Sequence, residues 1–288
     1  MLTLEAHAKI NLTLEILRKR NDGFHEIASV LQTISLHDTL TFEVADNINL
    51  LCQDPELAGD KNLAAKAARL LAERTDSKVG ATIKLTKRIP VAAGLGGGSS
   101  DAAATLLGLN KLWNLNQSRE DLRTIAESIG SDVPFFLDGG VAIVSGRGEQ
   151  VRQLPPTGVD WAVILTPPTQ LYNKTAAVYG AVTPSNYSAG ALTRKLGARI
   201  HSKGDIPPQF LFNAFDPVAQ GVFPNLDRYW RIFEGVGARE IHVCGAGPSL
   251  FAPVSSQQYG TAIELMLRHQ HGLVAHLVSF WSPQQGII

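Results

Sequence analysis

The stretch PVAAGLGGGSSDAAATL, residues 90–106, gathers four glycines around one leucine and runs at once into alanines and leucines. Glycine loses more backbone entropy on ordering than other residues, so a run this dense indicates left-handed φ angles or close approach by another group. Residues 81–90 before it are typical of a strand, and residues 101–113 after it are typical of a helix. A loop in that setting can direct several N–H groups at one anion, which predicts a phosphate site in preference to a plain surface turn.

The residue sequence of this loop excludes two common phosphate-binding motifs. A Walker loop requires a lysine directly after its glycines, and none follows here. A dinucleotide fingerprint requires a third glycine where Ser99 stands, and it belongs in the first βαβ unit of a chain. The loop is therefore predicted to belong to another phosphate-binding design.

The composition is that of a globular chain of 288 residues, 44% hydrophobic, with 26 acidic and 26 basic side chains. Zero formal charge gives no reason to expect nucleic acid or a membrane as a partner. Two cysteines without CxxC spacing, Cys52 and Cys244, argue against a disulfide framework or a zinc site. Without a signal peptide or an apolar run of ~20 residues, the expectation is a cytoplasmic protein, monomeric or weakly dimeric.

Hydrophobic periodicity suggests two domains. Residues 2–16 alternate with period two, which predicts a strand with Lys9 and Asn11 together on its polar face. Residues 62–74 predict a helix with Asn62 as its N-cap. Prolines cluster over residues 154–168, which places a boundary between domains of residues 1–155 and 156–288. The second domain follows strand–helix–strand–strand–helix–strand, the ferredoxin-like order.

Four stretches in order resemble the GHMP kinase superfamily. The glycine loop resembles its nucleotide loop, and VCGAGPSLFA, residues 243–252, resembles its third motif. AKINLTLEI, residues 8–16, and DGFHEI, residues 22–27, are similar to the signature of members that phosphorylate a cytidine-diphosphate-linked alcohol. IGSDVPFF, residues 129–136, matches a further motif of those members.

This resemblance implies an α+β fold, the two-domain GHMP kinase fold. It has an N-terminal ribosomal S5 domain 2-like βα domain with a left-handed crossover, and a C-terminal ferredoxin-like split βαβ domain. It implies direct phosphoryl transfer from ATP, with Mg²⁺, to the 2-hydroxyl of cytidyl-diphosphate methylerythritol in mevalonate-independent isoprenoid precursor synthesis. The alternatives are another GHMP kinase acting on homoserine, mevalonate or a sugar, or a nucleotide-binding protein without catalysis.

The resemblance also assigns catalytic residues. Asp132 is the expected base, although Asp before Val-Pro-Phe-Phe is also typical of an N-cap. Lys9 is expected to keep that carboxylate ionised and to stabilise the reacting oxygen, and a solvated surface lysine is the alternative. Asn11, on the same face, is expected to hydrogen-bond the substrate, unless it is simply an exposed strand residue.

The remaining site residues concern substrate, nucleotide and metal. Phe24, His25 and Tyr179 are expected to bind the cytosine by stacking and edge contacts, unless they are ordinary core or turn residues. Phe24 replaces the commoner tyrosine, which keeps stacking and removes a hydroxyl. Cys244 and Ala246 replace the usual serines of the third motif, so its contacts are expected from the backbone. The residues assigned to ATP are Pro90, Gly94, Leu95, Gly96, Gly97, Gly98, Ser99, Ser100 and Asn62. One of the two serines is expected to cap the following helix, and Ser100 to contact phosphate or Mg²⁺.

Overall fold

The computed structural model of the chain describes residues 1–59, 61–158, 161–169, 171 and 173–283, which form two compact units. Unit 1 comprises Met1–Ala8, Leu36–Val91 and Gly96–Gly139, and unit 2 comprises Lys9–Ser35, Ala92–Leu95 and Gly140–Ile288. The units interleave along the sequence because two long strands, β1 (Leu2–Lys19) and β2 (His25–Ala45), contribute residues to both. The proline-based division at residue 155 stays a prediction.

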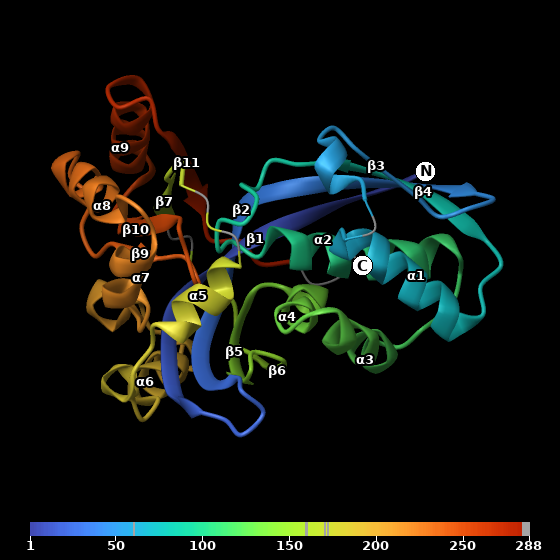
Figure 1. Ribbon diagram of the computed structural model, residues 1–288, viewed down its shortest axis with the longest axis horizontal. Coiled ribbons are helices and arrows are strands. Elements are labelled where there is room, and N and C mark those ends of the chain that lie inside the picture. Colours follow the sequence, from blue (N-terminus) through green and yellow to red (C-terminus); the bar gives the residue numbers. More distant parts are fainter. Residues whose placement is uncertain (60, 159–160, 170, 172, 284–288) are drawn as a thin grey trace. The chain divides into compact units, whose positions relative to one another are not determined.

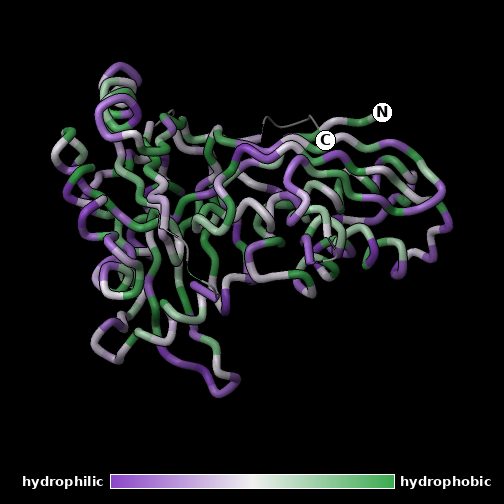
Figure 2. The backbone as a smooth tube through the Cα atoms, turned by 45° about the horizontal axis from the view of Figure 1, so that its top comes forward, coloured by the Kyte–Doolittle hydropathy of each residue, from purple (hydrophilic) through white to green (hydrophobic). Residues whose placement is uncertain are grey.

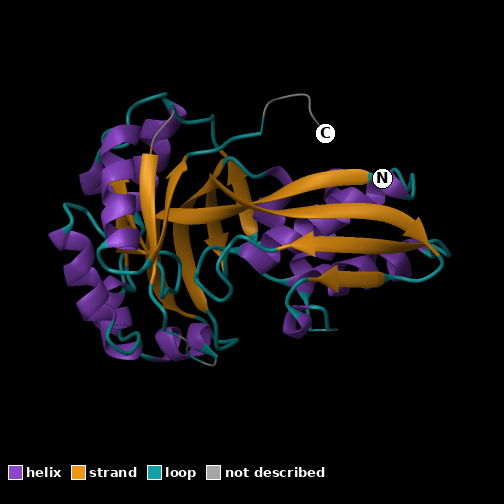
Figure 3. Ribbon diagram, turned by 90° about the horizontal axis from the view of Figure 1, so that it is seen from above, coloured by secondary structure: helices purple, strands orange, loops and turns teal. Residues whose placement is uncertain are grey.

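Unit 1 is a small sheet with helices on one face (Figures 1 and 3). Its strand β4 (Gly80–Thr86) pairs antiparallel with the second half of β2 and parallel with β3 (Asn49–Cys52). Its helices are α1 (Leu63–Thr75), α2 (Gly97–Leu112), α3 (Arg119–Ile129) and α4 (Val133–Asp138). The first three pack on one another, and α2 also packs on α4.

Helix limits in unit 1 follow from local side chains. The side chain of Asn62 accepts the N–H of Ala64 at 2.9 Å, which confirms the predicted N-cap of α1. Ser118 and Asp121 form a capping box at the start of α3. Such caps each contribute about 1 kcal/mol, and they fix where each helix begins.

The helix after the glycine loop begins earlier than predicted. It starts at Gly97 and not at residue 101, directly after Gly96, whose φ of 73° reverses the chain into the helix. Ser99 and Ser100 therefore lie inside its first turn, and the helix has no side-chain cap. The expectation that one of these serines caps α2 is wrong, because the positive φ of Gly96 makes the turn that a cap would otherwise support.

Unit 2 contains a four-stranded antiparallel sheet in the order β11 (Val274–Ser279), β7 (Trp161–Thr166), β10 (Leu250–Val254) and β9 (His242–Val243). The helix α9 (Gln257–His269) packs on β7, β10 and β11 (Figure 3). The strand order and the helix between the last two strands confirm the predicted ferredoxin-like arrangement.

Unit 2 also holds the first half of β2, which pairs with β5 (Val141–Gly146), and β5 pairs in turn with β6 (Gln150–Gln153). Strand β1 pairs in parallel with the short β8 (Phe212–Asn213). The other helices are α5 (Lys174–Gly180), α6 (Ala191–His201), α7 (Asp216–Val222) and α8 (Leu226–Gly235). A core of residues from β1, β7, β9 and β10 packs against α7, α8 and α9.

The polar face of β1 differs from its prediction. The strand forms as expected and carries hydrophilic and hydrophobic residues in turn (Figure 2), yet both of its faces are buried from Ala6 to Ile16. Within unit 2, hydrogen bonds to Ser29 and Thr193 satisfy its buried Asn11 and Thr13. This buried polar face positions the candidate site. No helix among the described residues is long and apolar enough to cross a bilayer.

Candidate active site

Lys9 and Asn11 form a buried polar pair on β1. The side chain of Lys9 is only 4% exposed, and its Nζ donates to Asn11 Oδ1 at 2.7 Å. The amide of Asn11 then donates to Ser29 Oγ at 2.8 Å, and Ser29 donates to the carbonyl of Thr13. A buried cation must be held by hydrogen bonds, so Lys9 is not the solvated lysine of the alternative prediction. No pattern in the sequence indicated Ser29.

The first half of the glycine loop is anchored in unit 2 by the turn of the third motif. Gly94 has a φ of 88°, and a Cβ there would lie 1.9 Å from the carbonyl oxygen of Cys244. The N–H of Ser249 donates to Ala93 O at 3.1 Å, and that of Lys9 donates to Leu95 O at 2.9 Å. Three segments far apart in sequence therefore meet through their backbones.

The turn after β9 presents its backbone toward Lys9. Gly245 has a φ of 53°, and a Cβ there would lie 3.0 Å from Lys9 Nζ. Asn213 holds this turn by donating to the carbonyls of Val243 at 2.7 Å and Gly245 at 2.9 Å. Burial raises the pKa of the Cys244 thiol to about 12, so it stays neutral near pH 7. A close backbone and an inert thiol favour the expected backbone role of this motif.

The second half of the loop lies in unit 1 and opens α2. Gly97 and Gly98 are the first helical residues, so their N–H groups have no partner within the helix. Such groups, with the positive end of the helix dipole, suit a phosphate. Ser100 is 3% exposed, whereas Ser99 is half-buried.

A lysine that sequence reasoning missed stands beside this half of the loop. A Cβ on Gly97 would lie 3.3 Å from Lys87 Nζ, so the ammonium faces the loop backbone. Lys87 donates to Asp38 and, at 2.8 Å, to Asp101 Oδ2. Asp38 is also fixed by the N–H groups of Arg88 and Ile89. The one sequence feature that could have indicated Lys87 was its position as a basic residue shortly before the loop.

One lysine shared between two buried carboxylates leaves one of them poorly neutralised. Oδ1 of Asp101 is buried without a hydrogen-bond partner among the residues that the structure describes. Burial raises the pKa of Asp101 to about 7; Lys87 opposes the rise, and the charge of Asp38 adds to it. The same two carboxylates raise the pKa of Lys87 against its burial. The cluster therefore favours a proton on Asp101 near neutral pH.

This cluster predicts a pH-dependent stability. Since the pKa of Asp101 is higher in the folded chain than its ordinary 3.8, the folded chain holds the extra proton between about pH 4 and pH 7. The contribution of Asp101 to the free energy of unfolding therefore falls as pH rises through that window. Asp101→Asn should be more stable relative to the unaltered chain at pH 8 than at pH 5, by an amount on the order of 2 kcal/mol. Thermal midpoints of both chains at the two pH values test this, and an equal difference at both contradicts it.

Asp132 occupies the N-cap position of α4, but its backbone is right-handed helical and its side chain makes no capping hydrogen bond. Capping therefore does not explain the presence of a carboxylate there. At the other end of α4, Asp138 pairs with Arg123 at 3.2 Å and approaches Arg119 at 3.8 Å. Asp138 is thus a structural carboxylate.

The aromatic residues expected at the cytosine lie in unit 2. His25 stacks on Tyr179 with ring centroids 5.1 Å apart, and Tyr179 packs edge-on against Phe215 at 4.8 Å. Phe24 is 52% exposed, with Arg147 over its ring at 4.9 Å. Burial, helped by the charge of Lys19, lowers the pKa of His25, so its imidazole is neutral at pH 7 and can both donate and accept.

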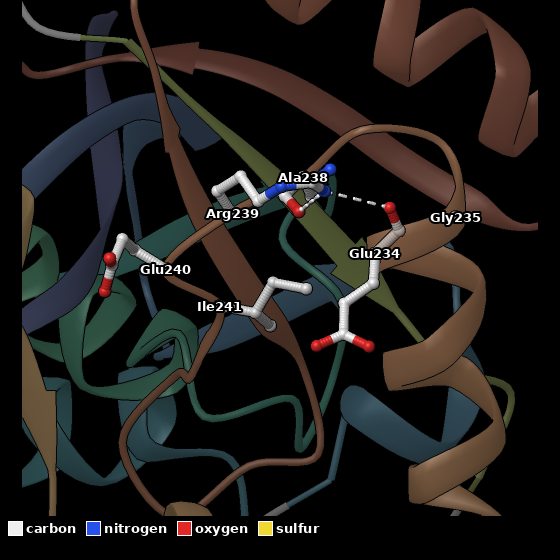
Figure 4. A pocket seen from close by; sticks show the side chains of 6 residues that line it. All are labelled: Glu234, Gly235, Ala238, Arg239, Glu240 and Ile241. Carbon is white, nitrogen blue, oxygen red and sulfur yellow. Dashed lines mark hydrogen bonds between the residues drawn. The ribbon is translucent and has the colours of Figure 1, made fainter.

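Two other residues assigned to ATP, Asn62 and Pro90, lie just before helix α1 and just before the glycine loop. The Asn62 amide that caps α1 also donates to Leu57 O at 2.6 Å, and Pro90 is half-buried in the segment before the loop. A cavity of about 380 Å³ lies elsewhere in unit 2 (Figure 4), and Arg239 on its wall donates to the carbonyls of Glu234 and Ala238. Its lining contains none of the predicted site residues; it is formed by Glu234, Gly235, Ala238, Arg239, Glu240 and Ile241.

The family model described as GHMP kinases N terminal domain matches residues 62–140. Homoserine kinase from Cytophaga hutchinsonii has the same fold, with a TM-score of 0.73 at 18% identity, covering 99% of this chain and 96% of that one. The two units and their glycine loop thus define a GHMP kinase, as the motifs predicted.

Relatives at higher identity narrow the class. A 4-diphosphocytidyl-2-C-methyl-D-erythritol kinase of Dehalococcoides mccartyi is 41% identical over 285 residues, 98% of this chain and 99% of its own. One of Pelotomaculum thermopropionicum is 41% identical, covering 87% and 88%. A crystal structure of 4-(cytidine 5'-diphospho)-2C-methyl-D-erythritol kinase superposes with a TM-score of 0.83 at 31% identity, covering 98% and 100%. The chain belongs to the 4-diphosphocytidyl-2-C-methyl-D-erythritol kinase family.

Proposed function

We propose that the protein transfers the γ-phosphoryl group of ATP to the 2-hydroxyl of 4-diphosphocytidyl-2-C-methyl-D-erythritol, in isoprenoid precursor synthesis that does not use mevalonate. The observation that carries the proposal is the full-length likeness to kinases of that name. His25, from the DGFHE stretch, stacks on Tyr179. This aromatic pair supports an alcohol substrate that carries a flat base.

In this proposal, phosphoryl transfer depends on position and charge. The N–H groups of the loop from Gly94 to Ser99 hold the triphosphate, and Lys87 adds a positive charge beside Gly97. Asp132 accepts the proton of the attacking hydroxyl, and the buried ammonium of Lys9 stabilises negative charge on the reacting oxygens. Asn11 orients Lys9 and meets the same end of the alcohol.

We propose that the reaction also requires Mg²⁺, which would neutralise charge on the phosphates of ATP. The loop fits that role: Ser100, in the first turn of α2, would offer its hydroxyl, and the nucleotide would supply most other ligands. Mg²⁺ prefers oxygen donors, so the one metal-type cluster found among the described residues, which is rich in histidine, does not suit it.

ADP release with ATP and a panel of alcohols tests the function. The cytidine-linked alcohol should be phosphorylated at its 2-hydroxyl far faster than homoserine, mevalonate or a sugar. Turnover of one of those three in its place would make the protein a different GHMP kinase. ATP binding with no turnover of any alcohol would favour the non-catalytic alternative.

The cytosine assignment predicts a selective loss of substrate binding. Tyr179→Ala removes the ring that stacks on His25, so affinity for the cytidine-linked alcohol should fall by the ~1–3 kcal/mol typical of base stacking. ATP affinity should not change. Calorimetric titration with each substrate measures both, and Tyr179→Phe, which keeps the ring, is the matched control. A loss of ATP affinity with normal alcohol binding would move the ring to the other pocket.

A further inference from the structure

We propose that Glu5, His7 and His37, all in unit 1, form a binding site for a divalent transition-metal ion of the Zn²⁺ type. One ligand atom from each side chain lies within 4.8 Å of both others. Among the residues that the structure describes, no other group of three such side chains converges in this way. The proposal does not depend on the kinase function.

The spacing of the three side chains is close to that of a bound ion. Nε2 of His7 lies 3.2 Å from Oε2 of Glu5, and Nε2 of His37 lies 3.6 Å from Oε1 of the same carboxylate. A tetrahedral ion with ligand bonds of about 2.0–2.1 Å sets neighbouring ligand atoms about 3.3 Å apart. Small rotations of these side chains would therefore open room for the ion between them.

The two histidines are held on the strands of a sheet. Glu5 and His7 lie two residues apart on β1 and share a face, and His37 projects from β2. The two imidazole rings have centroids 5.1 Å apart, inclined by 51°. His7 is 6% exposed and His37 is partly buried, whereas the Glu5 side chain is 55% exposed. The nitrogens are thus preorganised, and the carboxylate can swing to admit the ion.

The donor set selects the class of metal. Two imidazoles and one carboxylate suit Zn²⁺, Co²⁺ or Ni²⁺ and leave a fourth position for water, whereas Mg²⁺ and Ca²⁺ take oxygen donors. Cysteine spacing gave no sign of this site because it contains no cysteine. A bound ion would join β1 to β2 beside Asp38, the residue after His37, which holds Lys87 near the glycine loop.

Cobalt is the probe for the test, since four-coordinate Co²⁺ has an intense visible absorption. We expect the metal-free, untagged full-length chain to bind one Co²⁺ with that spectrum and to lose it to Zn²⁺. His37→Gln and Glu5→Gln should each weaken Co²⁺ binding by at least about tenfold. Glu5 is exposed, so its replacement should not disturb folding. His271→Gln, at another exposed position, is the matched control and should bind as the unaltered chain does.

Thermal unfolding gives a second readout. Zn²⁺ should raise the midpoint of the unaltered chain and of His271→Gln, because ligand binding to the folded state stabilises it, but should barely raise that of His37→Gln. Absence of Co²⁺ binding, a six-coordinate cobalt spectrum, or equal affinity in all three variants would overturn the proposal.

Discussion

Replacing Asp132 with asparagine should lower kcat at least ~10²-fold, the usual loss when a general base is removed, while both substrates still bind. Asparagine keeps the size of the side chain and an oxygen at the N-cap position. The Asp132 side chain makes no capping hydrogen bond that the substitution would remove. The thermal midpoint, measured alongside kcat, separates a loss of turnover from a loss of folding. Asp138→Asn, at the far end of α4, is the matched carboxylate control: it breaks the pair with Arg123 and should leave kcat unchanged. Near-normal turnover in Asp132→Asn would end the assignment of the base.

Lys9→Met extends this test to the second catalytic group. Methionine keeps the length of the stem and removes the charge, so turnover should again fall more than binding. It also leaves Asn11 Oδ1 buried without its donor, which should reduce the free energy of unfolding by ~1–3 kcal/mol. The double variant should lose less activity than the product of the single losses, since residues that act as a unit are not additive. Strictly multiplicative losses would mean that Lys9 does not work through Asp132.

Most of the fold could be predicted from patterns along the sequence. The strand β1, the cap Asn62 and the strand order of the ferredoxin-like sheet all appear as predicted from the sequence. The cap depends on interactions within a few residues, and the strand on a period that repeats along one element. The strand order follows from the succession of strands and helices along the chain. The start of α2 was misplaced because glycine propensity argues against a helix, whereas the left-handed φ of Gly96 fixes one there.

The missed features depend on contacts between distant residues. Lys87 donates a hydrogen bond to Asp38, which lies 49 residues away in the sequence. Asn213 donates to the carbonyls of Val243 and Gly245, which lie 30 and 32 residues away. Periodicity also showed which residues of β1 share a face, but not that other elements cover its polar face. Because of that burial, the ammonium of Lys9 is held by hydrogen bonds within the protein and is not solvated. Motif resemblance singled out Lys9 and Asn11, but neither motif nor period identified the partners that hold them.

Gly97→Val should abolish ATP binding in a chain that still folds. A Cβ on Gly97 would lie 3.0 Å from Ile89 Cγ2 and 3.3 Å from Lys87 Nζ, so the valine must displace both or project over the loop. Overpacking of this kind costs ~1–3 kcal/mol of stability. Hydrogen bonds to charged groups contribute ~1.5–3 kcal/mol each, so blocking two loop N–H groups should weaken ATP binding at least ~10²-fold. Calorimetry with ATP and a thermal melt measure the two effects separately.

Variants at Gly98 and Gly94 test whether this loop binds ATP or only needs glycine for its shape. At Gly98, which is exposed, a new Cβ would meet only Leu63 Cδ1 at an ordinary 3.7 Å, so Gly98→Ala should fold and bind ATP nearly as well as the unaltered chain. At Gly94, the φ of 88° and the 1.9 Å approach to Cys244 leave no space, so Gly94→Ala should fail to fold. If Gly97→Val instead kept normal ATP affinity, this part of the loop would be a turn that needs glycine for its shape, and the phosphates would bind elsewhere.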